Sequence, residues 1–216
     1  MTDEIINDGK LIAHLHFPSA IYTIDKPEFL DAVKDVSTTY LKQMKATKDK
    51  SNPLYPTQTA GIAHEPALAE FNNFIAQSAW NILNDQGHAM QNLGTYIQEM
   101  WAQEHAQYQG HDEHVHGHGA QISGFYIIDA PESGSKIAIH DPRQGRAQIN
   151  LPEESLDKIT LASSTALFIP KPGQMYFINS WLPHSVTRNT GKAPTRLVHF
   201  NLGVNRLPAR PEATII

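Results

Sequence analysis

The spacing of hydrophobic residues changes about halfway along the chain. In the first half, apolar side chains recur every three or four residues, which predicts amphipathic helices over about 29–46 and from near Pro66 to about residue 83. Asp25 and Glu28 stand in capping-box positions before the first of these helices, and Pro66 suits a first helical turn. The apolar stripes are Phe29, Leu30, Val33, Val36, Tyr40, Leu41 and Met44, then Leu68, Phe71, Phe74, Ile75, Ala79, Ile82 and Leu83.

The second half consists of short apolar or alternating runs separated by Gly, Pro and Asn. Such runs predict strands, and many short strands are typical of a β-sandwich or barrel. We therefore expect a mainly β fold with N-terminal helices packed on the sheet. We expect one domain over 1–216, with a mostly helical part (1–96), a β core (97–204) and a C-terminal tail (205–216). The predicted strands cover 17–24, 97–105, 121–129, 136–140, 166–169, 174–178 and 195–204.

Composition narrows the possible functions. The 216 residues include 17 Lys+Arg and 22 Asp+Glu, and the net charge of −5 argues against nucleic acid as a partner. There is no cysteine, which excludes disulfides and thiolate metal sites. No apolar stretch approaches the roughly 20 residues of a membrane span, and the first residues lack the features of a signal peptide. We expect a cytoplasmic protein without a membrane partner.

Histidines are concentrated in one segment. In a strand, residues i and i+2 share a face, so His114 and His116 place two imidazoles on one side. Two ligands do not complete a metal site, and His184, far downstream, is the candidate for a third. Arg196 follows twelve residues later. Five of the twelve histidines fall within residues 105–118: His105, His111, His114, His116 and His118.

Each of these features also has a simpler interpretation. The His-rich segment is compatible with a solvated loop that binds metals adventitiously. Taken alone, His184 suits a structural histidine and Arg196 suits a surface ion pair. The combination of a His-x-His pair with a distant His and Arg favours a metal site over these separate interpretations.

Several segments in this order resemble a known family. They are residues 114–116, 122–126, 140–143, 170–173, 182–186 and 196–201. Over residues 97–204 the chain resembles the double-stranded β-helix (a jelly-roll, cupin-like core) of iron(II)/2-oxoglutarate-dependent oxygenases. It is most similar to the 2-oxoglutarate oxygenases of phages and marine bacteria that lie near the prolyl 4-hydroxylases.

The resemblance implies Fe(II) and 2-oxoglutarate as cofactors and assigns roles to five residues. His114 and His184 would be iron ligands, and His116 stands where most of the superfamily has Asp or Glu. Arg196 would hold the distal carboxylate of 2-oxoglutarate, and Tyr126 would donate a hydrogen bond to the same cosubstrate. The implied reaction hydroxylates a C–H bond of an unidentified substrate, such as a peptidyl residue, while 2-oxoglutarate is decarboxylated to succinate.

Alternatives remain open at this point. His118, Asp112, Glu113 or Asp141 could replace His116 as the third ligand. A cupin-like metal-binding protein without oxygenase activity is the alternative function, and an arginine facing the metal would distinguish the two. A structural protein with a His-rich surface loop is a third possibility. A homodimer formed by pairing of strand edges is compatible with the pattern.

Overall fold

The computed structural model describes residues 13–47, 52–143, 145, 151–155 and 157–208. Two α-helices, each preceded by a short 3-10 turn, come before most of the strands. They are α1 (Leu30–Thr47) and α2 (Ala69–Asp85), after turns at Pro27–Phe29 and Pro66–Leu68. Of the α2 side chains in the predicted apolar stripe, Phe74 is partly buried and the others are buried: Phe71, Ile75, Ala79, Ile82 and Leu83.

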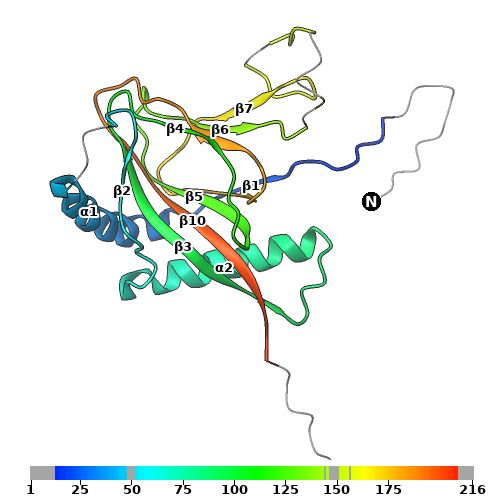
Figure 1. The fold of residues 1–216 in the computed structure, drawn as a ribbon, viewed down its shortest axis with the longest axis horizontal. Helices are drawn as coiled ribbons and strands as arrows, with labels where there is room; N and C mark the ends of the chain where they lie inside the picture. Colours follow the sequence, from blue (N-terminus) through cyan, green and yellow to red (C-terminus); the bar gives the residue numbers. More distant parts are fainter. Residues whose placement is uncertain (1–12, 48–51, 144, 146–150, 156, 209–216) are drawn as a thin grey trace, which may run out of the picture.

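The strands form two antiparallel sheets that face one another (Figure 1). The large sheet has the order β1 (Ile21–Asp25), β8 (Gln174–Asn179), β5 (Ala120–Asp129), β10 (Thr195–Arg206), β3 (Leu93–His105) and β2 (Thr57–Gln58). The small sheet has the order β4 (His111–His114), β9 (His184–Val186), β6 (Ile137–His140) and β7 (Thr165–Phe168).

The large sheet separates two hydrophobic cores. Both helices pack on one face of the sheet, which we call the outer face, and the small sheet covers the other, the inner face (Figure 1). Strand β10 shows the alternation clearly: Val198 and Phe200 belong to the core under the helices, whereas Leu197 belongs to the core between the sheets. Each odd-numbered residue of this part of β10 therefore points between the sheets.

A glycine lets β5 sit close to its neighbours at the centre of the large sheet. A Cβ atom added to Gly124 would lie 2.3 Å from the Phe200 ring and 2.5 Å from the carbonyl oxygen of Tyr176. Both separations are too short for any side chain. The glycine of the 122–126 segment is thus required by packing.

The six strands predicted between residues 97 and 204 are confirmed, with ends shifted by a few residues. Three short strands, β2, β4 and β9, are not among the predicted ones. The predicted cap at Asp25 is wrong, because this residue ends β1 and the turn that follows has Lys26 at its N-cap without a side-chain cap. Residues 209–216 of the expected tail lie outside the described residues. Neither α1 nor α2 combines the length and the apolar character needed to cross a bilayer.

Candidate metal centre

The three histidines predicted as ligands meet between the two sheets. His114 and His184 are cross-strand partners on β4 and β9, and their ring centroids are 4.4 Å apart. His116, just beyond the end of β4, lies 4.9 Å from the His114 ring and 5.1 Å from the His184 ring. Two imidazoles bound at right angles to one ion through bonds of about 2.1 Å have centroids roughly 4.6 Å apart. The three rings therefore fit three adjacent ligand positions.

Two of the rings are oriented by nearby backbone carbonyls. His114 Nδ1 lies 2.8 Å from the carbonyl oxygen of Asp112, and His184 Nδ1 lies 2.9 Å from that of Leu182. A carbonyl accepts a hydrogen bond, so each Nδ1 carries the proton and each Nε2 carries a lone pair. Both Nε2 atoms are buried and have no hydrogen-bond partner among the described residues. Each of these Nε2 atoms therefore has the free lone pair that a metal ligand needs.

His116 is held by a side chain instead. Its Nδ1 lies 3.1 Å from Nδ2 of the buried Asn201, whose Oδ1 accepts a hydrogen bond of 2.7 Å from the Ser123 hydroxyl. In this arrangement the amide donates to Nδ1, which leaves the proton of His116 on Nε2. Metal binding through Nε2 needs the other tautomer, with Nδ1–H donating to the amide oxygen. Asn201 Nδ2 also donates to Oε2 of Glu99 at 3.2 Å, so a half-turn of the amide that offers its oxygen to Nδ1–H would give up this bond.

A fourth histidine joins the cluster. The ligand atoms of His114, His116, His184 and His199 all lie within 4.8 Å of one another. His199 is on the inner face of β10, completely buried, and its ring stacks on Trp101 at 4.6 Å. The sequence analysis missed it. Strand alternation shows only that positions 196 and 199 lie on opposite faces of one strand, so Arg196 and His199 could not both face the metal.

Burial lowers the pKa of three of the clustered rings, those of His116, His184 and His199, and so favours their neutral form. Desolvation lowers the pKa of His184 to about 3 and, together with nearby histidines, that of His116 to about 4. The pKa of His199 is lowered well below its usual value, again chiefly by burial. Neutral imidazole is the form that binds metals, so protons do not compete for these nitrogens at neutral pH.

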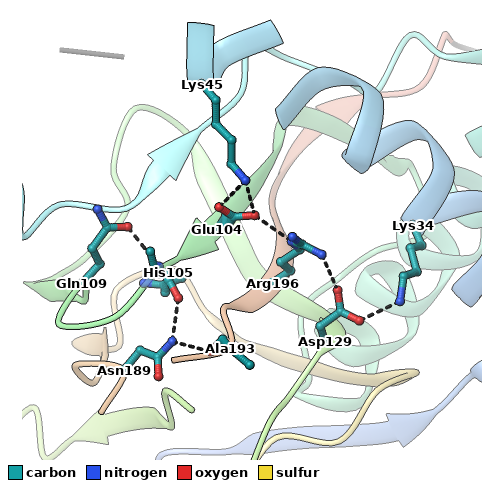
Figure 2. Close-up of polar contacts among 10 residues, drawn as sticks. Lys34, Lys45, Glu104, His105, Gln109, Asp129, Asn189, Ala193 and Arg196 are labelled. Atoms are coloured by element: carbon teal, nitrogen blue, oxygen red, sulfur yellow. Dashed lines mark hydrogen bonds and ion pairs between the residues drawn. The ribbon is translucent and has the colours of Figure 1, made fainter. Parts of the chain in front are cut away.

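Arg196 is not brought to the cluster. It lies on the outer face, where its Nε donates to Glu104 at 2.8 Å and its Nη1 to Asp129 at 3.1 Å. Figure 2 shows that Lys45 and Lys34 of α1 complete the network, at 2.7 Å from Glu104 and Asp129 respectively. The expected role of Arg196 as carboxylate anchor does not agree with this placement. The physical reason is strand alternation: a residue that faces α1 cannot also face the space between the sheets.

Tyr126 also lies on the outer face. Its ring packs edge-on against Phe71 of α2, with centroids 5.2 Å apart, and its hydroxyl donates to the carbonyl oxygen of Lys26 at 2.8 Å. Burial raises the pKa of this hydroxyl to about 12. The structure thus gives Tyr126 a packing role and does not place it beside the histidines.

The alternative third ligands lie away from the cluster. His118 is exposed, and its carbonyl accepts from Gln98. Glu113 faces His140 at 3.8 Å, and Asp141 binds Arg143. Asp112 is exposed, with its carboxylate 3.6 Å from Arg188. Within the part of the chain that the structure describes, the grouped metal-ligating side chains are the four histidines alone.

Comparisons of sequence and structure identify the class of this fold. Residues 99–201 match a family described as "Putative 2OG-Fe(II) oxygenase". This segment contains all four clustered histidines, and over it the chain is similar to the 2OG-Fe(II) oxygenases. The resemblance seen in the sequence is confirmed. No protein of curated function matches the sequence significantly.

Several solved structures share the fold. A Pseudomonas putida prolyl-4-hydroxylase is similar with a TM-score of 0.56 and 9% identity, over 88% of this chain and 94% of that one. AviO1 from Streptomyces viridochromogenes Tue57 gives 0.59 and 10%, over 90% and 93%. HygX from Streptomyces hygroscopicus, solved with nickel and 2-oxoglutarate, gives 0.51 and 10%, over 86% and 83%. The expected double-stranded β-helix is therefore confirmed.

Proposed function

We propose that this protein is an iron(II)- and 2-oxoglutarate-dependent oxygenase whose metal is held by His114, His116 and His184. The observation that carries the proposal is the convergence of three buried rings whose Nε2 atoms lack hydrogen-bond partners among the described residues. Three adjacent ligands leave the opposite side of an octahedral ion for a cosubstrate and oxygen. The match of residues 99–201 to the oxygenase family supports iron as the metal.

The chain's own residues would bind and shield the centre. Backbone carbonyls already orient the rings of His114 and His184. The two side chains therefore lose little conformational freedom when the metal ion binds. The Phe125 ring stands edge-on to His184 at 5.4 Å and belongs to the core between the sheets, which excludes water from that side. Iron and 2-oxoglutarate supply the oxygen chemistry: one oxygen atom enters the substrate C–H bond, and the other enters succinate as carbon dioxide leaves.

The nature of the prime substrate is a further part of the proposal. The similarity in fold to a prolyl-4-hydroxylase makes a peptidyl side chain the first candidate. The net charge of −5 argues against nucleic acid, and the absence of cysteine fits a reducing cytoplasm. Pairing of exposed strand edges would be the route to a homodimer.

The test is metal-dependent turnover. The protein, loaded with Fe(II) without oxygen, should develop a visible charge-transfer band on addition of 2-oxoglutarate, and should release succinate when oxygen and a suitable peptide panel are admitted. His184→Ala should lose both signals, whereas His118→Ala, a histidine from the same region but outside the cluster, should keep them. If wild-type protein shows neither signal, the oxygenase assignment is wrong.

One observation favours a second candidate, a cupin-like metal-binding protein without oxygenase activity. Arg196 faces α1, and the hydrogen bonds and ring contacts of the four histidines involve no Lys or Arg among the described residues. A metal-storage or sensing site needs no such anchor. Tight binding of Fe(II) or Zn(II) together with no measurable affinity for 2-oxoglutarate would favour this candidate.

A further inference from the structure

Three side chains with unpartnered nitrogen atoms line the inner face of the large sheet beside the histidine cluster. Trp101 and Gln103 of β3 face inward, because their partners on β10, His199 and Leu197, face the space between the sheets. Gln103 is fully buried, and its Nε2 has no hydrogen-bond partner among the described residues. The indole nitrogen of Trp101 and both ring nitrogens of His199 are likewise buried without a partner in this part of the chain. We call Trp101, Gln103 and His199 the donor row.

The chemistry of the donor row suits a ligand that accepts hydrogen bonds. An amide NH2 group and an indole N–H can only donate, and a neutral imidazole carries one N–H. Oε1 of Gln103 lies 3.2 Å from Nε2 of His105, so the amide oxygen has a partner and the amide nitrogen has none. A buried donor without an acceptor destabilises the fold, so several of them together mark the place of a ligand that is rich in acceptor oxygens. A carboxylate is such a ligand.

The donor row begins at the metal centre and leads away from it. The ring centroids of His199 and Trp101 lie 4.6 Å and 6.3 Å from that of His116. Gln103 follows Trp101 by two residues on the same face of β3, a step of about 6.6 Å along the strand. A molecule that binds the metal with one end would therefore pass His199 and Trp101 and reach the amide of Gln103 with its other end.

Charge balance removes the need for an arginine at this place. Three neutral imidazoles leave both positive charges of Fe(II) uncompensated, and the two carboxylates of 2-oxoglutarate carry two negative charges. A carboxylate ligand, as in a centre of two histidines and one carboxylate, would cancel one of the positive charges. Because His116 is neutral, the metal itself balances both carboxylates of the cosubstrate. The distal carboxylate then needs N–H donors, which stabilise its charged form, but no cation.

We propose that the donor row binds 2-oxoglutarate through neutral N–H groups, with Gln103 as the anchor of the distal carboxylate. This inference rests on the function proposed above. Trp101 donates to the same carboxylate, and His199 donates to the oxygen atoms of the cosubstrate nearer the metal. The donor row thereby takes the role that the sequence analysis assigned to Arg196, which is held in ion pairs on the outer face.

The binding of two 2-oxo acids tests this assignment. Calorimetric titration of the anaerobic Fe(II) protein and of the oxygen-stable Co(II) protein would compare 2-oxoglutarate with pyruvate, which lacks the distal carboxylate. Gln103→Leu should weaken the binding of 2-oxoglutarate about ten-fold or more and that of pyruvate less than two-fold. Its Co(II) affinity, measured by competition with a chelator, should stay the same. Trp101→Phe keeps an aromatic ring against His199 and should weaken the binding of 2-oxoglutarate about three-fold.

The matched control is Gln98→Leu, which removes another glutamine of β3. The amide of Gln98 already donates to the carbonyl oxygen of His118 at 2.9 Å, and its loss should leave both affinities unchanged. An unchanged affinity of Gln103→Leu for 2-oxoglutarate, or equal wild-type affinities for the two acids, would overturn the inference and leave the proposed function intact. A wild-type protein that binds Fe(II) or Co(II) but no 2-oxoglutarate would overturn both. Should Gln103→Leu fail to fold, Trp101→Phe decides, and full affinity of that variant would contradict the inference.

Discussion

The two faces of the large sheet both contain buried polar side chains, but they use them differently. On the outer face, Arg196 and Glu104 are joined to each other, and each has a further partner of opposite charge in Asp129 or Lys45 (Figure 2). On the inner face, the four histidines leave nitrogen atoms without partners among the described residues. Fully paired polar groups stabilise a fold, whereas buried unpaired ones mark a place for a ligand. The comparison therefore separates the ion-paired arginine from the histidines that we propose as metal ligands.

The largest expected effect is on metal binding by the inner face. Replacing His184, which is fully buried and bonded to a backbone carbonyl, removes one of three adjacent ligands. We expect His184→Ala to weaken Fe(II) or Co(II) binding more than about 100-fold, measured by competition with a coloured chelator. His118→Ala should change the affinity less than two-fold. A comparable loss in His118→Ala would mean that the loop histidine is the true ligand.

Removing the central charge of the outer face should affect stability and not metal affinity. Arg196→Met leaves Glu104, whose side chain is only 6% exposed, with Lys45 alone. Because the network is partly solvated, we expect a loss of about 2 kcal/mol in the free energy of unfolding. Denaturant unfolding and metal titration measure the two quantities. A ten-fold weaker binding of 2-oxoglutarate without loss of stability would restore Arg196 as the carboxylate anchor.

The inner face also predicts how stability depends on pH. The pKa of His184 is lowered to about 3 and that of His116 to about 4, against an ordinary value of 6.5, chiefly by burial. The unfolded chain therefore binds more protons than the folded one between these values, and the metal-free protein should lose stability as the pH falls from 6.5 towards 4. Urea unfolding across this range checks the sign. His184→Phe should flatten the dependence, and an unchanged slope would contradict the lowered pKa.

A smaller effect is expected from the side chain that orients His116. Asn201→Leu removes the amide beside Nδ1 and should weaken metal binding about ten-fold. Asn201→Asp should cost less affinity than Asn201→Leu, since a carboxylate accepts the Nδ1–H that a metal-bound imidazole carries, although it gives up the hydrogen bond to Glu99. Equal losses in the two variants would show that Asn201 acts through packing and not by setting the tautomer.

The smallest effect should come from Tyr126 on the outer face. Tyr126→Phe removes one hydrogen bond to the Lys26 carbonyl and should cost about 1 kcal/mol of stability. Affinity for 2-oxoglutarate, measured by calorimetry on the metal-loaded protein, should stay the same. A clear drop in that affinity would return Tyr126 to the cosubstrate site.

Much of this architecture could be predicted from local pattern. The apolar period predicted α1 and α2, and alternating runs predicted the long strands, because both patterns record which side chains a helix or strand can bury. The short strands β4 and β9 escaped detection, since three or four residues such as 184–186 carry too little pattern to recognise. The convergence of His114, His116 and His184 agrees with expectation in geometry, and their role as ligands stays a prediction.

The sequence by itself indicated the class of this protein: the order of its β segments, the His-x-His pair and the distant histidine make it similar to the 2OG-Fe(II) oxygenases. Only the tertiary structure decided which side chains lie on the same face of the large sheet. The pleat of β10 turns His199 inward and Arg196 towards α1, and the ion pairs with Glu104 and Asp129 hold the arginine there. Proximity along a chain does not fix the face of a strand, because side chains on successive residues point in opposite directions.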